Sequence, residues 1–443
     1  MLINFSIQNF GSVKDKQTLS FEADKSEHLE DYYVIHSNGL RLLKLALIYG
    51  ANASGKTTIL QALQFLMSIV LKPQEQKTQS LNFEPFLFDP NTPKQNTIFN
   101  IDFIQNNIRY FYEVELNRKS IVKEVLSHAH NPNKLKNRVK IFERTTNSEN
   151  QFTNIIFGSN IKIDEVYSKT LMANTLWNNT VLGGFLKTNI ELKELIDVTN
   201  WFDKYLSPVI YTNSELENFV TKSIEKSEID KTTVLDVLKK ADFNLSDISI
   251  KKEDEDIPEG LLDFLEKQKD NIAEDKIQDL KNKGKITSIS LEFEHAVKDK
   301  FYSLPFEKES QGTQRYYGLA GILYVLIKES TAILIDELEA SLHPDLFQHF
   351  LLSFITNSKT SQIIATTHNR EILNDKDIFR NDVIWITDKT NEDCATELYS
   401  LADFDTKVIR DTTNILNAYK LGKLGGVPNL GDYYIEIEND EKE

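Results

Sequence analysis

The segment Gly50–Thr57 constrains this chain more than any other part of the sequence. It reads GANASGKT and fits the pattern G-x-x-x-x-G-K-[ST] at every fixed position. The glycines allow a tight loop whose N–H groups, together with the N-terminus of a following helix, point at one anion. The segment lies between a nearly continuous apolar run, Leu43–Tyr49, and a helical pattern over Thr57–Leu71. This order predicts a buried strand, a phosphate-binding loop and a helix, which form half of a βαβ unit.

Two segments of the chain are predicted to supply the two halves of a magnesium–nucleotide site. In the loop, Lys56 can reach the β- and γ-phosphates, and the hydroxyl of Thr57 can bind Mg²⁺. Far along the chain, the apolar strand Thr331–Ile335 ends in two carboxylates, Asp336 and Glu337. Asp336 is placed to hold Mg²⁺ directly or through water. Glu337 is a candidate general base that would activate the attacking water.

A histidine follows the next predicted strand, Gln362–Ala365, in the sequence Thr-Thr-His. Neighbouring parallel strands present their carboxyl ends to one crevice, so we expect His368 to lie close to Glu337. There it can contact the γ-phosphate or bridge Glu337 and the attacking water through its ring nitrogens.

A Ser-Gln-Gly-Thr turn at residues 310–313 opens another predicted helix. The hydroxyl and the backbone N–H groups of such a turn can bind an anion. An ordinary N-cap, with Ser310 or Thr313 as the capping residue, explains the same residues equally well. The spacing leaves both interpretations open.

Strand and helix patterns divide the chain into four predicted parts. Short β-rich runs between residues 97 and 157 predict an antiparallel meander, and the alternation of strands and helices after residue 286 predicts parallel sheet. The four parts are an N-terminal ATPase lobe with the loop and the meander (1–159), a helical insertion or lid (160–285), a C-terminal ATPase lobe (286–430) and an acidic tail (431–443).

Composition narrows the class of protein. The 443 residues exceed what one hydrophobic core usually serves. Lys+Arg 51 against Asp+Glu 67 gives a net charge of −16, which is a poor match for a protein that coats DNA. A single cysteine, Cys394, excludes an internal disulfide framework and fits a reducing compartment. No apolar run reaches the ~20 residues that a membrane span requires. We therefore expect a cytoplasmic protein that does not enter a membrane.

Taken together, these motifs resemble the head of ABC-type ATPases. They are the loop, the Ser-x-Gly-Thr turn, the strand that ends in Asp-Glu, a Glu-x-x-x-His-Pro turn that ends at Pro344, and Thr-Thr-His. Within that class the chain is similar to the SMC/RecF/OLD-like branch. Its opening (INFSIQNFGSVKDKQTLSFEA), Pro85–Asp89 and Ala418–Pro428 resemble a narrower group, the PARIS- and RloA-like ATPase subunits of two-gene phage-defence modules.

The resemblance implies an α/β fold: an ABC-ATPase-like head with a parallel-rich core sheet, an antiparallel β-meander and a helical insertion. It implies ATP and Mg²⁺ as cofactors, Thr57 and Asp336 as metal ligands, and catalytic roles for three side chains: Glu337 as base, His368 as switch histidine, and Lys56. The signature turn would contact a γ-phosphate bound to a partner subunit, so that ATP joins two copies of the chain. The implied nucleotide-binding residues are Gly50, Ala51, Asn52, Ala53, Ser54, Gly55, Lys56, Thr57, Thr58, Ser310, Gly312 and Thr313.

The sequence departs from the pattern of that class in two places. His343 replaces the aspartate expected in the turn after the strand that ends at Asp336, so communication across the dimer is expected to differ. No single glutamine can be assigned to the Q-loop, because Gln74, Gln76 and Gln79 all lie in the expected region.

OLD-like relatives often carry a second catalytic centre, that of a TOPRIM nuclease. Glu371 followed by Asp375 and Asp377 imitates its carboxylate pattern. Too little chain follows for another α/β domain of ~100 residues. We therefore interpret the two aspartates as part of a solvated turn, and we expect any nuclease to be a separate chain.

Two functions remain open at this stage. The first is an ATP-driven sensor and scaffold of anti-phage defence that oligomerises through ATP and controls a separate effector, a TOPRIM-like nuclease. A nucleic acid or a phage protein would be its trigger. The alternative is an SMC/RecF-like ATPase of DNA maintenance that clamps DNA, which requires a basic stripe. Lys134–Lys140 (KLKNRVK) is the best candidate for such a stripe, although a solvated hairpin also explains it. Intact Glu337 argues against a third possibility, a switch without turnover.

Overall fold

The computed structural model describes residues 1–129, 138–257, 284–389, 392–404 and 414–428, and the single positions 260, 278, 281 and 282. Contacts divide the chain into two compact units. Unit 1 comprises Met1–Thr212, Glu329–Ala340 and Ile355–Glu443, and unit 2 comprises Asn213–Lys328 and Ser341–Phe354. The predicted acidic tail (431–443) and most of 258–283, within the predicted insertion, lie outside the described residues.

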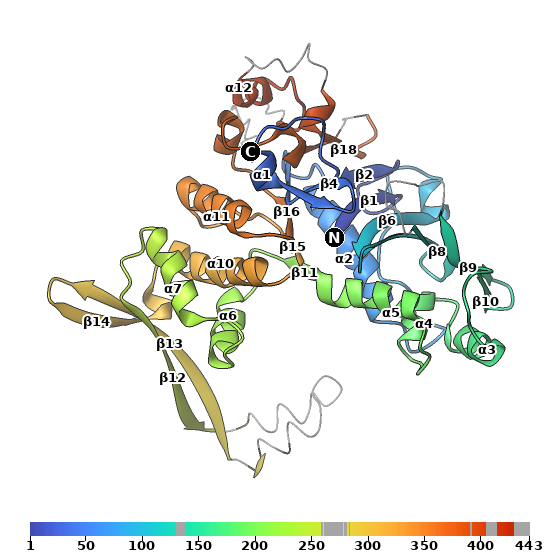
Figure 1. Cartoon of the computed structure of the whole chain (residues 1–443), viewed down its shortest axis with the longest axis horizontal. Helices are drawn as coiled ribbons and strands as arrows, with labels where there is room; N and C mark the ends of the chain where they lie inside the picture. Colours follow the sequence, from blue (N-terminus) through green and yellow to red (C-terminus); the bar gives the residue numbers. More distant parts are fainter. Residues whose placement is uncertain are drawn as a thin grey trace, which may run out of the picture. The chain divides into compact units, whose positions relative to one another are not determined.

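Unit 1 contains a seven-stranded antiparallel sheet with the order β10-β9-β8-β7-β6-β1-β2 (Figure 1). Five consecutive strands, β6 to β10, follow one another as hairpins, so the predicted antiparallel meander is confirmed. The strands are β1 (Leu2–Gln8), β2 (Gln17–Ser20), β6 (Thr97–Gln105), β7 (Ile108–Leu116), β8 (Ile121–Ala129), β9 (Val139–Asn147) and β10 (Phe152–Phe157).

The second large sheet of unit 1 has six strands in the order β11-β15-β16-β5-β17-β18. All neighbours are parallel except β17 and β18, which confirms a parallel-rich core sheet. The strands are β5 (Leu45–Gly50), β11 (Leu206–Ile210), β15 (Ala332–Ile335), β16 (Gln362–Thr366), β17 (Ile384–Lys389) and β18 (Thr396–Ser400). Every residue of β5 is buried, as its continuous apolar run predicts.

Helix α2 (Lys56–Leu71) connects the two sheets of unit 1, because it packs against β5, β16 and β11 and also against β1. The buried side chain of Gln362 connects them too. Its amide oxygen accepts hydrogen bonds from Leu2 N–H (2.7 Å) and from the hydroxyl of Tyr205 (2.8 Å). Its amide nitrogen donates to the carbonyls of Leu2 and Leu43, each at 3.0 Å. Gln362 therefore satisfies backbone groups where the ends of the two sheets meet.

Shorter elements complete unit 1. A two-stranded sheet pairs β3 with β4 in antiparallel fashion. A π-helical turn at Trp201–Tyr205 leads into β11. The remaining elements are α1 (Glu30–Tyr33), β3 (Val34–Ser37), β4 (Leu40–Leu43), α3 (Glu165–Asn174), α4 (Val181–Phe185), α5 (Lys193–Asn200) and α12 (Ile415–Lys420).

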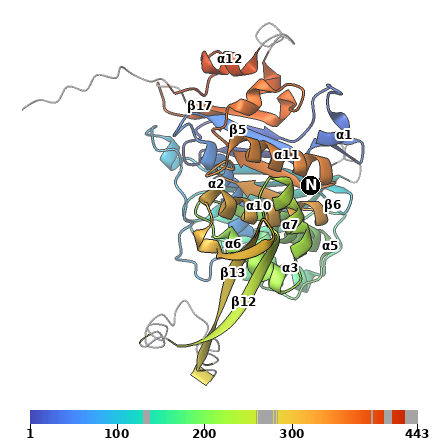
Figure 2. The same cartoon turned by 90° about the vertical axis from the view of Figure 1, so that its left-hand side faces the viewer.

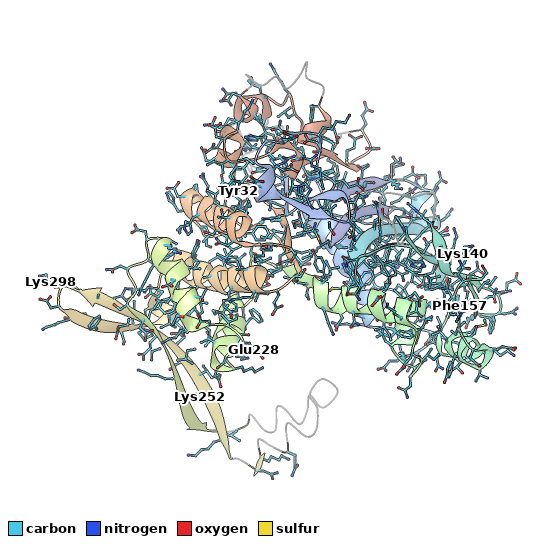
Figure 3. The ribbon with its side chains drawn as sticks, in the orientation of Figure 1. Tyr32, Lys140, Phe157, Glu228, Lys252 and Lys298 are labelled. Carbon is cyan, nitrogen blue, oxygen red and sulfur yellow. The ribbon has the colours of Figure 1, made fainter. Side chains whose placement is uncertain are left out.

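Unit 2 combines helices with a three-stranded antiparallel sheet of the order β12-β13-β14. Helix α10 packs against α6 and α7. Strands β12 and β13 run side by side away from these helices, as Figure 2 shows. Figure 3 labels two exposed lysines of this sheet, Lys252 on β12 and Lys298 in the turn before β14. The elements are α6 (Leu216–Glu225), α7 (Lys231–Lys240), β12 (Asp247–Asp256), β13 (Lys285–Val297), β14 (Lys300–Pro305), α10 (Gln311–Lys328) and α11 (Pro344–Asn357), whose last turn belongs to unit 1.

The segment 160–285 is not the purely helical insertion that its composition suggested. Helices α3 to α7 lie in it, but so do β11 and β12. Strand β11 contains Pro208, which is tolerated because β11 is an edge strand of its sheet. Strand β12 carries a run of charged residues that the sequence pattern did not distinguish from a solvated helix. The boundaries of the four predicted parts remain predictions.

Candidate functional site

The predicted phosphate loop links β5 to α2 within unit 1, and two of its glycines have no room for a side chain. A Cβ atom at Gly50 would lie 2.3 Å from Oγ1 of Thr387. Gly55 has a φ of +103°, and a Cβ atom there would lie 2.1 Å from Oγ1 of Thr396. The loop thus passes close to β17 and β18, and only glycine fits at these two points.

Lys56, the first residue of α2, is buried with its ammonium group inside the curve of the loop. Its Nζ donates hydrogen bonds to the carbonyls of Gly50 and Ala51, each at 3.0 Å. Burial lowers the pKa of Lys56, and the nearby carboxylates of Glu337 and Asp336 oppose this shift. A phosphate at this position would supply the charge-assisted hydrogen bonds that a buried ammonium favours.

Asp336 connects the loop to the neighbouring strands. The hydroxyl of Thr57 donates to both carboxylate oxygens of Asp336 at 3.1 Å, and the hydroxyl of Thr366 donates to Oδ1 at 2.6 Å. The arrangement follows from the parallel pairing of β15 with β16 and of β16 with β5, which brings the carboxyl ends of these strands to one edge. Segments 279 residues apart in sequence therefore meet at one carboxylate.

The donor set around Asp336 fits Mg²⁺ in chemical terms. A hydroxyl and a carboxylate are hard oxygen ligands, and Mg²⁺ is usually held by one or two such groups together with water and phosphate oxygens. Among the described residues, no group of three or more His, Cys, Asp and Glu side chains could hold a metal ion by itself. Thr57 and Asp336 are therefore suited to a metal that arrives with a nucleotide.

Glu337 leaves the strand end in an unusual backbone conformation. Its φ of +49° lies in the left-handed region, which non-glycine residues rarely adopt. Its N–H donates to the hydroxyl of Thr366 at 2.8 Å, which holds this conformation. The carboxylate is 49% exposed, so water can reach it. Backbone strain of this kind is typical of functional sites.

His368 lies near Glu337, as predicted from the order of the strands. Its Nε2 is 3.9 Å from Oε1 of Glu337, and its backbone N–H donates to the carboxylate of Glu339. Burial and the positive charge of Lys56 lower the pKa of His368. The imidazole is therefore neutral at pH 7 and can both donate and accept a hydrogen bond.

A cavity of about 440 Å³ opens beside Glu337 and His368 in unit 1, and Lys56, Thr57 and Asp336 are not among the residues that line it. Its walls combine loop residues, two of the three predicted catalytic side chains, and three residues for which the sequence predicted no role in the site. The lining residues are Gly50, Ala51, Asn52, Glu337, His368, Arg370, Tyr419 and Pro428. Arg370 could have been suspected from its position two residues after His368. Tyr419 and Pro428 belong to the segment Ala418–Pro428, which resembles a known family but for which the sequence predicted no chemical role.

Three remaining loop residues have structural contacts. Ala53 adopts a left-handed φ of +62° and is exposed. The hydroxyl of Ser54 is buried and bonds to Oγ1 of Thr387 at 2.6 Å. Oγ1 of Thr58 is 3.0 Å from Oγ of Ser12. These contacts fix the loop from both sides, while the roles of the three residues in nucleotide binding remain predictions.

The predicted signature turn opens α10 in unit 2. Oγ of Ser310 accepts the N–H of Thr313 at 3.1 Å and lies 2.8 Å from its hydroxyl, so Ser310 caps the helix. A Cβ atom at Gly312 would lie 3.2 Å from the carbonyl of Ser341. Of the two interpretations of this turn, the N-cap is the one that the hydrogen bonds of Ser310 match. Because Ser310 is also exposed, the same turn can still contact a second molecule.

The two departures from the ABC pattern have local explanations. His343 is exposed, and its Nδ1 accepts the N–H of Asp345 at the start of α11 at 3.3 Å. The side chain of Gln79 closes a turn by accepting the N–H groups of residues 75 and 76. Gln74, Gln76 and Gln79 do not line the cavity, so the Q-loop assignment stays open.

Two further sequence predictions concern segments away from the cavity. Asp375 and Asp377 lie in and beside a turn, where Asp377 is exposed. Within the candidate basic stripe, residues 134–137 lie outside the described part of the chain. Arg138 stacks on Phe111, with Cζ 3.6 Å from the ring centre, and Lys140 pairs with Glu143. The described members of the stripe are thus engaged locally.

Comparisons with known proteins give one family and several solved structures. The profile of the AAA_15 family, described as an AAA ATPase domain, matches residues 1–373. Among curated proteins, none matches the sequence at a significant level. Similar structures include an SMC head bound to the C-winged helix domain of ScpA (14% identity, 90% of this chain and 97% of that chain, TM-score 0.45). The SMC head domain from Thermotoga maritima is 13% identical over 90% of this chain and 98% of its own, with a TM-score of 0.39.

A third similar structure is an SMC head domain with an extended coiled coil, bound to the C-terminal domain of ScpA, from Pyrococcus furiosus. It is 14% identical over 96% of this chain and 98% of its own, with a TM-score of 0.38.

Among the described residues, none of the helices combines the length and the apolar character needed to cross a bilayer. The family match includes the loop, Asp336, Glu337, His368 and Arg370, and it ends before Tyr419.

Proposed function

Because this chain belongs to the AAA_15 family of ATPase domains, we propose that it binds Mg·ATP at the Gly50–Thr57 loop and hydrolyses the bond to the terminal phosphate. One observation carries this proposal: the hydroxyl of Thr57 and the carboxylate of Asp336 are 3.1 Å apart. Two segments that are remote in sequence, each suited to one half of a magnesium–nucleotide site, lie together at one strand edge.

In this proposal, different residues of the chain bind the phosphates, hold the metal ion and activate the attacking water. The N–H groups of the loop and the N-terminus of α2 bind the phosphates, and Lys56 binds the oxygens nearest to the scissile bond. Thr57 and Asp336 hold Mg²⁺, which neutralises phosphate charge when bound. Glu337 accepts a proton from the attacking water, and neutral His368 orients that water by hydrogen bonding.

Replacing Glu337 by Gln tests this assignment directly. The change keeps the shape of the side chain and removes its basicity, so we expect ATP binding to persist and turnover to fall at least about 100-fold. Binding is measured by equilibrium dialysis with labelled ATP, and turnover by phosphate release. Glu371→Gln is the matched control, because Glu371 is exposed and does not line the cavity. Unchanged hydrolysis in Glu337→Gln removes Glu337 from the role of base.

We also propose that ATP joins two copies of the chain. The turn at Ser310–Thr313, where Ser310 is exposed, would then contact the γ-phosphate held by the other copy, so ATP and not ADP would favour assembly. In Glu337→Gln, added ATP is expected to shift the chain to a dimer or a larger oligomer in size-exclusion chromatography with light scattering. Ser310→Arg places a bulky side chain at this turn and should abolish the shift while ATP binding is retained. An ATP-bound species that stays monomeric contradicts the proposal.

For the biological role, we propose an ATP-driven sensor and scaffold of anti-phage defence in the cytoplasm, which controls a separate effector such as a TOPRIM-like nuclease. The family resemblance of the opening residues, Pro85–Asp89 and Ala418–Pro428 supports this role. The trigger would be a nucleic acid or a phage protein. Plaque counts on cells that carry the gene and its neighbours test it: protection is expected with the wild-type chain and lost with Glu337→Gln. Equal plaque counts with and without the wild-type gene contradict this role.

The competing function, a DNA clamp, can be distinguished from the proposed one by how strongly the affinity for duplex DNA depends on salt concentration. A clamp binds duplex DNA through phosphate contacts, so its affinity falls steeply as salt increases. The local engagement of Arg138 and Lys140 and the net charge of −16 argue against a strong phosphate-binding stripe. Fluorescence anisotropy with a labelled DNA duplex, measured at 50 and 200 mM salt, distinguishes the two functions. Tight binding at 50 mM that collapses at 200 mM favours the clamp.

A further inference from the structure

The segment 414–428 reaches the cavity from the far end of the chain. It consists of α12 and the turn that follows, and it belongs to unit 1 together with the loop. Helix α12 packs against the 3₁₀-helical turn Glu371–Asn374, which follows Arg370. Two of its residues, Tyr419 and Pro428, line the same cavity as Glu337 and His368. This segment lies beyond the residues that the family profile matches.

Close packing fixes this segment against the start of the loop. The hydroxyl of Tyr419 donates to the carbonyl of Gly426 at 2.8 Å, and its ring packs edge-on against Tyr49, with ring centres 6.3 Å apart. A Cβ atom at Gly426 would lie only 2.7 Å from a methyl group of Ile386 and 3.4 Å from Cα of Gly50. The position of Tyr419 is therefore determined by the loop and by the core strands.

Tyr419 in turn holds a cationic side chain. The guanidinium carbon of Arg370 lies 5.6 Å from the centre of the Tyr419 ring, a distance typical of cation–π contact. Arg370 is half-buried and lines the cavity with Gly50, Glu337 and His368. Within the described part of the chain, no carboxylate lies within ion-pair distance of it, although other arginines such as Arg109 and Arg380 have such partners.

We propose that Arg370 is a ligand for the terminal phosphate of the nucleotide and that Tyr419 positions it. This proposal rests on the proposed ATP binding and extends it, because it assigns a second cationic contact beside Lys56. The planar guanidinium offers paired N–H donors that match two phosphate oxygens, and stacking on Tyr419 limits the freedom that binding must remove. Glu337 lies in the same cavity, so a cation there also reduces the repulsion between its carboxylate and the phosphate.

The key test compares ATP with ADP, because a ligand of the terminal phosphate contributes to one and not to the other. For Arg370→Ala we expect ATP affinity to fall about 10- to 100-fold, the range for charge-assisted hydrogen bonds, while ADP affinity changes less than about 3-fold. Arg370→Lys keeps the charge and loses the paired donors, so its loss of ATP affinity should be intermediate. Affinities are measured by isothermal titration calorimetry with Mg²⁺, and thermal unfolding without nucleotide confirms that each variant is folded.

Tyr419 is tested with a pair of variants. Tyr419→Phe keeps the ring that supports the guanidinium, so the preference for ATP over ADP should be retained. Tyr419→Leu removes the ring and should reduce this preference about 3- to 10-fold, in the direction of Arg370→Ala. A merely structural role for Tyr419 would instead weaken ATP and ADP binding equally.

The outcomes separate this inference from the proposed function. Wild-type chain that fails to bind ATP overturns both. Wild-type chain that binds and hydrolyses ATP, while Arg370→Ala keeps the wild-type ratio of ATP to ADP affinity, overturns the role of Arg370 and leaves the ATPase proposal in place. Equal losses for both nucleotides also overturn it.

Discussion

The strand edge around Asp336 in unit 1 and the sheet β12–β14 in unit 2 differ in how their residues are fixed. Every residue of β5 is buried, whereas every residue of β14 is exposed. At the first, close approach excludes any side chain at Gly50, and hydroxyls hold Asp336 from two sides. At the second, ion pairs such as Lys251–Glu292, whose lysine side chain is half exposed, connect neighbouring strands. The comparison indicates that single substitutions will have large effects in the first region and small ones in the second.

The largest effect is expected at Gly50. In Gly50→Ala, the new Cβ atom meets both the hydroxyl and the backbone carbonyl of Thr387 within 2.5 Å, so β5 or β17 must move. We expect a loss of about 3 kcal/mol in the free energy of unfolding, measured with urea, and no detectable ATP binding. Gly422→Ala is the control. A Cβ atom at Gly422 would have no neighbour within 4 Å, and only the φ of +71° disfavours a side chain there. We therefore expect Gly422→Ala to lower the free energy of unfolding by about 1 kcal/mol. Equal losses in both variants contradict the argument from close packing.

The next effect concerns the amide of Gln362. Gln362→Ala leaves the buried N–H of Leu2 without its acceptor, and the hydroxyl of Tyr205 keeps only its longer bond, at 3.3 Å to the carbonyl of Thr360. We expect a loss of about 2–4 kcal/mol in urea unfolding. In unit 2, Gln314 donates to two backbone carbonyls but is only partly buried, so Gln314→Ala should cost about 1 kcal/mol. A larger loss for Gln314→Ala would reverse the comparison.

A buried carboxylate gives a third prediction, in the pH dependence of stability. Burial raises the pKa of Glu124 in β8 to about 7. The folded chain therefore keeps a proton that the unfolded chain releases near pH 4.5, and the stability contributed by this group is lost as pH rises from about 4.5 to 7. Relative to wild type, Glu124→Gln should show a weaker decline of the free energy of unfolding across this window. Parallel pH profiles for the two proteins contradict the assignment.

The smallest effect is expected on the exposed sheet. Nζ of Lys251 pairs with the carboxylate of Glu292 at 2.7 Å, but the lysine side chain is half exposed. Exposed pairs of this kind contribute little, so Lys251→Ala should change the free energy of unfolding by less than about 0.5 kcal/mol, with a smaller change in high salt. A loss above about 1 kcal/mol would mean that the sheet contributes to stability in the way that the buried strands do.

The same comparison explains what could be predicted from sequence. The ends of the strands that flank the site were predicted to within two residues, because a continuous apolar run indicates a strand that is buried between helices. The meeting of Thr57 with Asp336 followed from parallel strand order and from motif spacing. These predictions concern positions where burial or close packing allows few residue types, so the sequence itself indicates the local structure.

The structure also contains features that local pattern could not predict. Strand β12 alternates polar and apolar residues only over Asp247–Ile250 and continues as an unbroken charged run, Lys251–Asp256, so its apolar pattern is too short to give a strand signal. Strand β11 contains Pro208, which argues against a strand unless the edge position is known. Arg370 and Tyr419 meet through tertiary packing alone, because 49 residues separate them in the sequence.

The place of β5 in its sheet has a consequence for biosynthesis. This strand ends at Gly50, yet its two neighbours, β16 and β17, begin only at Gln362 and Ile384. At about 5–20 residues per second, the ribosome exposes β5 for tens of seconds before either partner emerges. A wholly apolar strand with two open edges is prone to aggregate during that interval. We therefore expect nascent chains that stop before Gln362 to depend on chaperones, and chains that extend past β17 to gain solubility.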